Sequence, residues 1–213
     1  MKISLKRRRE LADMTLAALG NAFPDVACTL DRDLPERLAI RGILSAQCTD
    51  ERVNITAGEL FEKYPTMEQI RDAGVDTIGD IIRPCGLHRA KSRSVIAFAT
   101  AYCSRWDHRV PSDVTELMTC PGIGRKIANL IVGEIYAIPA MVVDTHCKRV
   151  MYRIGITDNT DPAKVEADIC KVFPSSCWIA LGHQSVALGR AYCRAARPAC
   201  DTCPLSSFCL RRV

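Results

Sequence analysis

Apolar residues recur along the chain at intervals of three and four positions, the spacing that places side chains on one face of an α-helix. Between residues 90 and 103 this spacing joins Val95, Ile96, Ala99 and Cys103. No segment shows the sustained alternation of apolar and polar residues that is typical of a half-buried β-strand. The pattern predicts an all-α protein, with a helix that begins at Pro35 and further helices at residues 67–73, 77–83, 90–103, 125–136, 145–154 and 162–172.

Local signals mark the ends of several of these helices. Thr66 and Asp76 are expected to cap the helices at 67–73 and 77–83, because their side-chain oxygens can accept hydrogen bonds from the first turn. Ser112 is expected to begin another helix, and Pro121 to end it. No Gly/Ser linker divides the chain, so we expect these helices to be joined by short turns.

The composition of the 213 residues excludes several classes of protein. Apolar residues make up 48% and charged residues 25%, which is typical of a globular protein and not of a disordered or fibrous one. The longest apolar stretch, residues 127–143, contains Asn129, Glu134 and Pro139 and is too interrupted to cross a bilayer. No apolar run follows the basic N-terminus, so no secretory signal is expected. We therefore expect a cytoplasmic protein without a membrane partner.

The charge distribution is compatible with a polyanionic partner. The formal net charge is +5, from 29 Lys and Arg against 24 Asp and Glu, and a mildly basic surface without such a partner explains it equally well. The positions of the charges are more informative. Five arginines gather near the C-terminus, where only one acidic residue interrupts them: Arg190, Arg194, Arg197, Arg211 and Arg212.

Four of the twelve cysteines are concentrated near the C-terminus, in the order Cys193-x6-Cys200-x2-Cys203-x5-Cys209. Without an export signal the cysteines are expected to stay reduced, which argues against a disulfide framework. Structural zinc sites usually combine two short Cys-x2–4-Cys pairs, whereas this segment contains one such pair. A cubane iron–sulfur cluster accepts one compact pair and wider arms, so the spacing admits it beside zinc and unligated thiols.

A second signal lies at residues 117–136, where one helix ends, the chain turns through Pro-Gly-Ile-Gly, and a new helix begins at once. Gly122 and Gly124 permit close backbone approaches, and Ile123 can insert into the core. The free N–H groups and the positive dipole end of the second helix would then form an anion site suited to phosphate. The alternative is a tight helix–helix turn without a ligand.

This hairpin resembles the helix-hairpin-helix of the endonuclease III family of DNA glycosylases. The segments ILSAQCTDERVN (residues 43–54), CGLHRAK (85–91) and VDTH (143–146) resemble other motifs of that family and follow its order. The spacing of the four C-terminal cysteines matches its [4Fe–4S] loop at every position. The resemblance extends over residues 38–209 and implies a bifunctional glycosylase and AP lyase that acts in base excision repair.

The resemblance assigns a nucleophilic amine to Lys126 and a supporting carboxylate to Asp144. A lysine in the first turn of a helix, if partly buried, favours the neutral amine, which could attack the sugar carbon that bears the damaged base. The resulting Schiff base would permit β-elimination on the 3′ side. Taken singly, the lysine could instead be a phosphate contact, and the aspartate could be only the cap of the helix from Thr145.

Further DNA contacts also follow from the resemblance. Gln47 would enter the space vacated by an extruded nucleotide, and Leu87 would wedge the opposite side. The competing accounts are a helix-end hydrogen bond for Gln47 and a core position for Leu87. Arg194 and Arg197 are expected to contact phosphates, and Lys91 and Arg149 are weaker candidates for the same contact.

Together these features predict a monomeric, two-lobed helical protein that binds double-stranded DNA in the cleft between its lobes. One lobe would comprise residues 28–138, with the helix-hairpin-helix, and the other residues 1–27 and 139–213, with the [4Fe–4S] cluster loop. The substrates would be DNA with damaged bases, oxidised pyrimidines by resemblance, or abasic sites. A glycosylase for mismatched or deaminated bases and a non-catalytic iron–sulfur DNA-binding protein are the alternatives.

Overall fold

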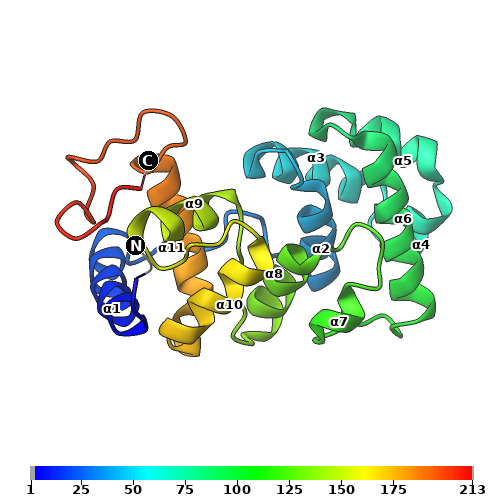
Figure 1. Cartoon of the computed structure of the whole chain (residues 1–213). Helices are drawn as coiled ribbons and strands as arrows, with labels where there is room; N and C mark the ends of the chain where they lie inside the picture. The colour runs from blue at the N-terminus through cyan, green and yellow to red at the C-terminus, as the bar shows by residue number, and fades with distance from the viewer. Residues whose placement is uncertain (1–2, 213) are drawn as a thin grey trace. The chain divides into compact units, whose positions relative to one another are not determined.

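The computed structural model describes residues 3–212, and within them it contains helices and loops but no β-strand. The predicted all-α fold is therefore confirmed. No helix in the described part of the chain is long and apolar enough to span a membrane. The helices, shown in Figure 1, are α1 (Leu5–Ala22), α2 (Pro35–Leu44), α3 (Asp50–Lys63), α4 (Met67–Asp72), α5 (Val75–Ile81), η1 (Arg83–Cys85), α6 (His88–Ser104), α7 (Val114–Leu117), α8 (Arg125–Tyr136), α9 (Thr145–Ile154), α10 (Pro162–Val172), η2 (Ser175–Cys177) and α11 (Trp178–Ala191).

Of the three side chains expected to begin helices, Thr66, Asp76 and Ser112, two do not do so. Thr66 caps α4 as predicted, and its hydroxyl and the Gln69 side chain form a reciprocal capping box. Helix α5, however, begins after Gly74, whose φ of 85° turns the chain two residues earlier than expected, so Asp76 lies inside the first turn. Helix α7 is capped by Asp113, whose carboxylate accepts a hydrogen bond from the Glu116 backbone N–H at 2.7 Å, and not by the neighbouring Ser112.

The chain divides into two compact units, which are described separately. Unit 2, Cys28–Ile138, is built around α2, which packs on α3, α6 and α8. Every residue of α2 from Leu38 to Leu44 is buried. Among them, Arg41 pairs with Asp31 and Asp33 and lies over the Phe61 ring. The buried guanidinium is thus compensated by charge and by aromatic contact.

Unit 1 combines Met1–Ala27 with Pro139–Val213. Its core joins apolar residues of α1, α9, α10 and α11, among them Leu11, Val150, Ile169 and Leu188. After α11 the chain continues as an irregular loop that carries the four clustered cysteines (Figure 1, orange to red). Helix α1 therefore folds with the C-terminal part of the chain, from which it is distant in sequence.

A polar network holds the two ends of unit 1 together. Asp158 pairs with Arg8 of α1 and, at 2.6 Å, with Arg212 near the C-terminus. Arg8 also lies 3.7 Å from Asp168 of α10, which accepts a hydrogen bond from Thr157 at 2.7 Å. These charges therefore link α1 to α10, to the loop before α10 and to the C-terminal end of the described chain.

Candidate functional site: a glycine hairpin, a lysine and a cysteine loop

The hairpin forms between α7 and α8 as the sequence predicts. Ile123 is 3% exposed and anchors the turn in the core of unit 2. Gly122 adopts φ 88°, a conformation that L-residues rarely reach, and a Cβ built there would lie 2.5 Å from the Ser94 side chain. The turn therefore needs glycine at position 122 both for its backbone angle and for its contact with α6.

Gly124 differs from Gly122 in its backbone angle and in the space around its Cα. It is the N-cap of α8, with φ −87° and no side chain that caps the helix. A Cβ built on Gly124 would meet no heavy atom within 4 Å, so space is open beside the first turn of α8. The N–H groups of a first turn lack acceptors within their own helix. This helix start is consequently available to an anion that approaches its backbone.

Helices α2 and α6 carry the other DNA-contact candidates of unit 2. A Cβ at Gly42 of α2 would lie 2.9 Å from Ile127 of α8, so these two helices approach closely. Gln47 follows the C-terminal end of α2, and Leu87 is the N-cap of α6, which contacts the hairpin through Ser94. The structure thus places both residues on elements that pack directly against the hairpin or its second helix.

Gln47 and Leu87 share an unusual backbone conformation. Their φ angles are 54° and 49°, in the left-handed region that costs a non-glycine residue roughly 1–2 kcal/mol. Both side chains are exposed, and Leu87 retains 55% of its accessible surface, which excludes the core position considered as an alternative. Two exposed, strained residues at neighbouring helix ends are typical of positions held for contact with a ligand.

The two lysines of unit 2 that were candidates for DNA contact lie in different environments. Lys126, the second residue of α8, is exposed. Lys91, predicted to contact phosphate, is 4% exposed and donates a hydrogen bond of 2.7 Å to the Cys85 carbonyl. Burial lowers the pKa of Lys91. Lys91 thus holds the loop before Leu87 from inside, and phosphate contact is excluded in this structure.

Asp144 lies in unit 1, immediately before α9. It is half-buried, and its carboxylate accepts a hydrogen bond of 2.7 Å from the Cys147 backbone N–H. The expected capping of the helix from Thr145 is therefore present. The cap uses Oδ1, and a carboxylate has acceptor sites on both oxygens, so capping and a second interaction are chemically compatible.

Two arginines of α9 organise the cysteine loop. Arg149 donates hydrogen bonds to the carbonyls of Cys193 and Gly189, at 2.8 and 3.3 Å. Arg153, one turn later, donates to the carbonyls of Arg194 and Ala195, at 2.6 and 3.0 Å. The phosphate contact predicted for Arg149 is thus wrong, because its guanidinium is occupied inside unit 1. The i, i+4 spacing of the two arginines was the sequence signal for this shared role.

The four C-terminal cysteines gather in this loop, half-buried and without disulfide bonds. Burial raises the pKa of the Cys203 thiol, a backbone hydrogen bond at Leu205 lowers it, and the charges of the other three cysteines raise it further. Their surroundings supply hydrogen-bond donors: Arg153 Nη1 lies 3.4 Å from Cys193 Sγ, and the Arg211 backbone N–H lies 3.5 Å from Cys209 Sγ. Such donors stabilise negative charge on sulfur.

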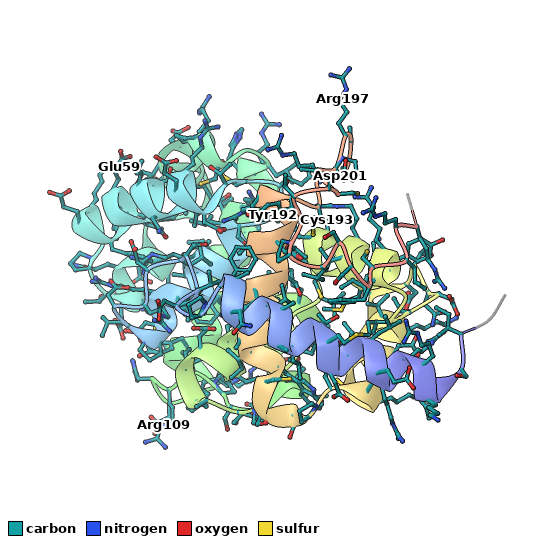
Figure 2. The ribbon with its side chains drawn as sticks, turned by 90° about the vertical axis from the view of Figure 1, so that its left-hand side faces the viewer. Glu59, Arg109, Tyr192, Cys193, Arg197 and Asp201 are labelled. Atoms are coloured by element: carbon teal, nitrogen blue, oxygen red, sulfur yellow. The ribbon has the colours of Figure 1, made fainter. Side chains whose placement is uncertain are left out.

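The loop also displays the two arginines predicted to contact phosphates. Arg194 and Arg197 are both exposed, and Figure 2 shows Arg197 projecting away from the rest of the loop. Arg197 itself has φ 52°. The candidates thus fall into two sets. Unit 2 contains the hairpin, Lys126, Gln47 and Leu87. Unit 1 contains Asp144, Arg194, Arg197 and the four cysteines.

A family model described as HhH-GPD superfamily base excision DNA repair protein matches residues 40–175. The chain therefore belongs to this superfamily. It is 36% identical to endonuclease III of Synechocystis sp. over 98% of this chain and 94% of that protein, and 34% identical to endonuclease III of Bacillus subtilis over 92% and 90%. Within the superfamily it is accordingly a member of the endonuclease III family.

Solved structures agree with this assignment. A non-covalent endonuclease III–DNA complex matches with a TM-score of 0.90 at 35% identity, over 94% of both chains. A trapped endonuclease III–DNA covalent intermediate matches with the same score and identity. A thermostable thymine-DNA glycosylase, 21% identical, shares the fold with a TM-score of 0.77.

Proposed function

We propose that this protein is a DNA glycosylase and AP lyase of base excision repair that removes oxidised pyrimidines from double-stranded DNA and then cleaves the strand. The observation that carries this proposal is Lys126, an exposed amine in the first turn of an uncapped helix behind a glycine hairpin. The trapped covalent intermediate of a relative 35% identical to this chain supports it, because covalent trapping requires a nucleophile on the protein.

The reaction begins with attack by the neutral Lys126 amine on the sugar carbon that bears the base. A bond from Nζ to this carbon forms, and the bond to the base breaks, with the electron pair leaving on the base. Lys126 is exposed in the free protein, so we attribute the desolvation of its amine to the DNA that covers it during the reaction.

Asp144 would support this step through its charge. Its carboxylate stabilises the positive charge that develops on the sugar as the base departs, and it can accept the proton that the attacking amine loses. The sugar ring then opens: the bond from this carbon to the ring oxygen breaks, the ring oxygen takes a proton, and a C=N Schiff base forms, which makes the adjacent C–H acidic. Loss of that proton breaks the bond to the 3′ phosphate, which is the β-elimination of an AP lyase.

Unit 2 would supply the DNA contacts around the lesion. Gly122 shapes the turn, and Gly124 with the first turn of α8 offers the backbone N–H groups for a phosphate. Gln47 and Leu87 would occupy the duplex where the damaged nucleotide is extruded. Their exposure and their left-handed φ angles support this assignment.

The cysteine loop would hold a [4Fe–4S] cluster through Cys193, Cys200, Cys203 and Cys209. A single zinc ion at about 2.3 Å from each sulfur requires sulfurs roughly 3.8 Å apart. Among the described residues, however, no three of these sulfurs lie within 4.8 Å of one another. The sequence spacing, with one compact pair and two wider arms, fits a cube of iron and sulfur better than one ion. When bound, the cluster would cross-link the loop that carries Arg194 and Arg197.

Two further assignments belong to this proposal. We take unit 2 and unit 1 as the two domains of the enzyme. We also expect a monomer that acts in the cytoplasm, where bacterial relatives would meet chromosomal DNA. The +5 net charge supports the interaction with a polyanion.

Borohydride trapping tests the proposed chemistry directly. A Schiff base is reducible, so borohydride added during turnover on a duplex with an oxidised pyrimidine should link protein and DNA covalently. Lys126→Gln should abolish trapping and nicking. Lys164→Gln is a matched control, because Lys164 is also an exposed lysine in the first turn of a helix. Trapping that persists in Lys126→Gln would identify another amine as the nucleophile.

A panel of duplexes then decides the substrate. Oxidised pyrimidines, mismatched bases, deaminated bases and abasic sites should be scored separately for base release and for nicking. We expect release and nicking together on oxidised pyrimidines, and nicking alone on abasic sites. Base release without nicking on every lesion would instead identify a glycosylase that lacks lyase activity.

A further inference from the structure

Three metal-ligating side chains converge in unit 2 outside the residues assigned to DNA or to the cluster. Glu68 is the second residue of α4, Cys103 lies near the C-terminal end of α6, and His108 lies in the loop that follows. A carboxylate oxygen, a thiol sulfur and a ring nitrogen from these residues all lie within 4.8 Å of one another. The packing of α4 on α6 brings these residues together from two sequence segments.

The atoms have separations that suit one metal ion. Glu68 Oε1 lies 3.2 Å from His108 Nδ1 and 3.6 Å from Cys103 Sγ. In a tetrahedral zinc complex with bonds of about 2.0–2.3 Å, neighbouring ligand atoms are roughly 3.3–3.8 Å apart. Both contacts of the carboxylate therefore already have nearly the spacing of a zinc site, and only small side-chain movements separate the observed arrangement from a coordinated one.

The loop backbone is held so that the imidazole faces the carboxylate. Asp107 and His108 have φ angles of 46° and 57°, two successive non-glycine residues in the left-handed region. The His108 backbone N–H donates a hydrogen bond of 3.0 Å to the Tyr102 carbonyl, and its ring meets the Tyr102 ring edge-on. The strained turn is therefore fixed by the end of α6 and does not depend on Glu68 alone.

We propose that Glu68, Cys103 and His108 form a zinc-binding site. Thiolate, imidazole and carboxylate are the ligands that zinc uses in proteins, whereas Ca²⁺ and Mg²⁺ select oxygen ligands. As the Zn–S bond forms, the Cys103 thiol proton leaves to solvent, and His108 binds through its Nδ1 lone pair with its proton on Nε2. The side chains of His108 and Glu68 are 54% and 42% exposed, so water can occupy the fourth position.

The charges around the site do not oppose a cation. Arg71, on the same helix as Glu68, is engaged by the Asp72 carboxylate through hydrogen bonds of 2.7 and 3.0 Å. Without a metal, the thiol of Cys103 and the imidazole of His108 would both donate to Glu68. A hydrogen-bonded triad that takes no metal is the competing account of these contacts.

X-ray absorption at the zinc edge distinguishes these accounts in the whole protein, whose iron does not interfere at that edge. One equivalent of zinc chloride should bind, with one sulfur at about 2.3 Å, nitrogen and oxygen ligands at about 2.0–2.1 Å, and unchanged iron content. A shell made up of sulfur alone, or iron lost as zinc enters, would place the zinc in the cysteine loop and overturn the proposal. Absence of bound zinc would favour the hydrogen-bonded triad.

Ligand variants provide a second, independent measurement. Cys103→Ser and His108→Gln should each weaken zinc binding by more than ~100-fold, since even outer-shell changes cost metal sites 10–100-fold. Cys177→Ser, which removes a half-buried thiol from unit 1, is the matched control and should bind zinc like the wild type. Melting temperature and iron content check that each variant is folded. Unchanged affinity in both ligand variants would overturn the proposal.

Discussion

The two glycines of the hairpin should respond differently to an added side chain. At Gly122 the side chain should lower the stability of the fold, whereas at Gly124 it should weaken DNA binding. At Gly122 the backbone has φ 88°, and a Cβ would lie 2.5 Å from both Cβ and Oγ of Ser94. Rotation of the Ser94 hydroxyl cannot relieve the contact with its own Cβ. At Gly124 the backbone has φ −87°, which any residue adopts, and a Cβ meets nothing within 4 Å. Packing within the fold therefore requires glycine at position 122. At position 124 the fold accepts a side chain, and only a bound phosphate would require glycine.

The expected magnitudes follow from these contacts. For Gly122→Ala the left-handed backbone costs about 1–2 kcal/mol and overpacking about 1–3 kcal/mol, which in a chain of this size lowers the melting temperature by roughly 5–15 °C. For Gly124→Val the change in the free energy of unfolding should stay within about 1 kcal/mol. Loss of one hydrogen bond to a charged phosphate, about 1.5–3 kcal/mol, weakens DNA binding roughly 10- to 150-fold.

Thermal unfolding by circular dichroism and fluorescence anisotropy with labelled duplexes measure the two effects separately. Gly124→Val should bind lesion-bearing and undamaged DNA more weakly to the same extent, because a backbone contact to phosphate carries no sequence or lesion information. Wild-type affinity in Gly124→Val would remove the hairpin from the DNA interface. A melting temperature that falls as far as in Gly122→Ala would refute the assignment of open space at position 124.

Three further predictions concern other parts of the chain. Asp144→Asn should lose most of the turnover rate with a melting temperature near that of the wild type, because the Asn oxygen can still accept the Cys147 N–H. Burial raises the pKa of Asp33, but hydrogen bonds from Arg41 and Arg37 lower it more, to about 2. The stability of the wild type should therefore fall as the pH drops from about 4 to 2, and Asp33→Asn should reduce this pH dependence. Cys203→Ser should lose iron and the yellow-brown colour on purification, and stoichiometric zinc without iron in the wild type would contradict the cluster assignment.

The helices whose ends carry strong local signals were predictable from sequence. Helices α8, α9 and α10 have the predicted bounds, because each begins directly after a residue that suits the N-cap position. These N-cap residues are Gly124, Asp144 and Asp161. The predicted start of α5 was wrong because both Gly74 and Asp76 are suitable N-cap residues. The positive φ of Gly74 turns the chain before Asp76 can act as a cap.

Burial of the lysines was harder to predict, because it depends on which face of a helix packs inward. The motifs located Lys126 correctly in the first turn of α8, but the residues that would bury it are not provided by its own helix. Lys91 belongs to the face of α6 that also carries Val95 and Phe98, all of them buried. That i, i+4, i+7 relationship was present in the sequence and argued for an inward position, against the phosphate contact inferred from charge alone.

The arginines of unit 1 show why net charge is a poor guide to a DNA surface. Arg149 and Arg153 direct their guanidinium groups at carbonyls of the cysteine loop, and Arg153 also reaches the sulfur of Cys193. A [4Fe–4S] cluster with four thiolates would carry about −2, which these cations offset from within the unit. Arg194 and Arg197, by contrast, are exposed on the loop and are the arginines that we propose contact phosphates. Neutralising them should therefore reduce the salt dependence of DNA binding, whereas neutralising Arg149 or Arg153 should first destabilise the loop that holds the cluster.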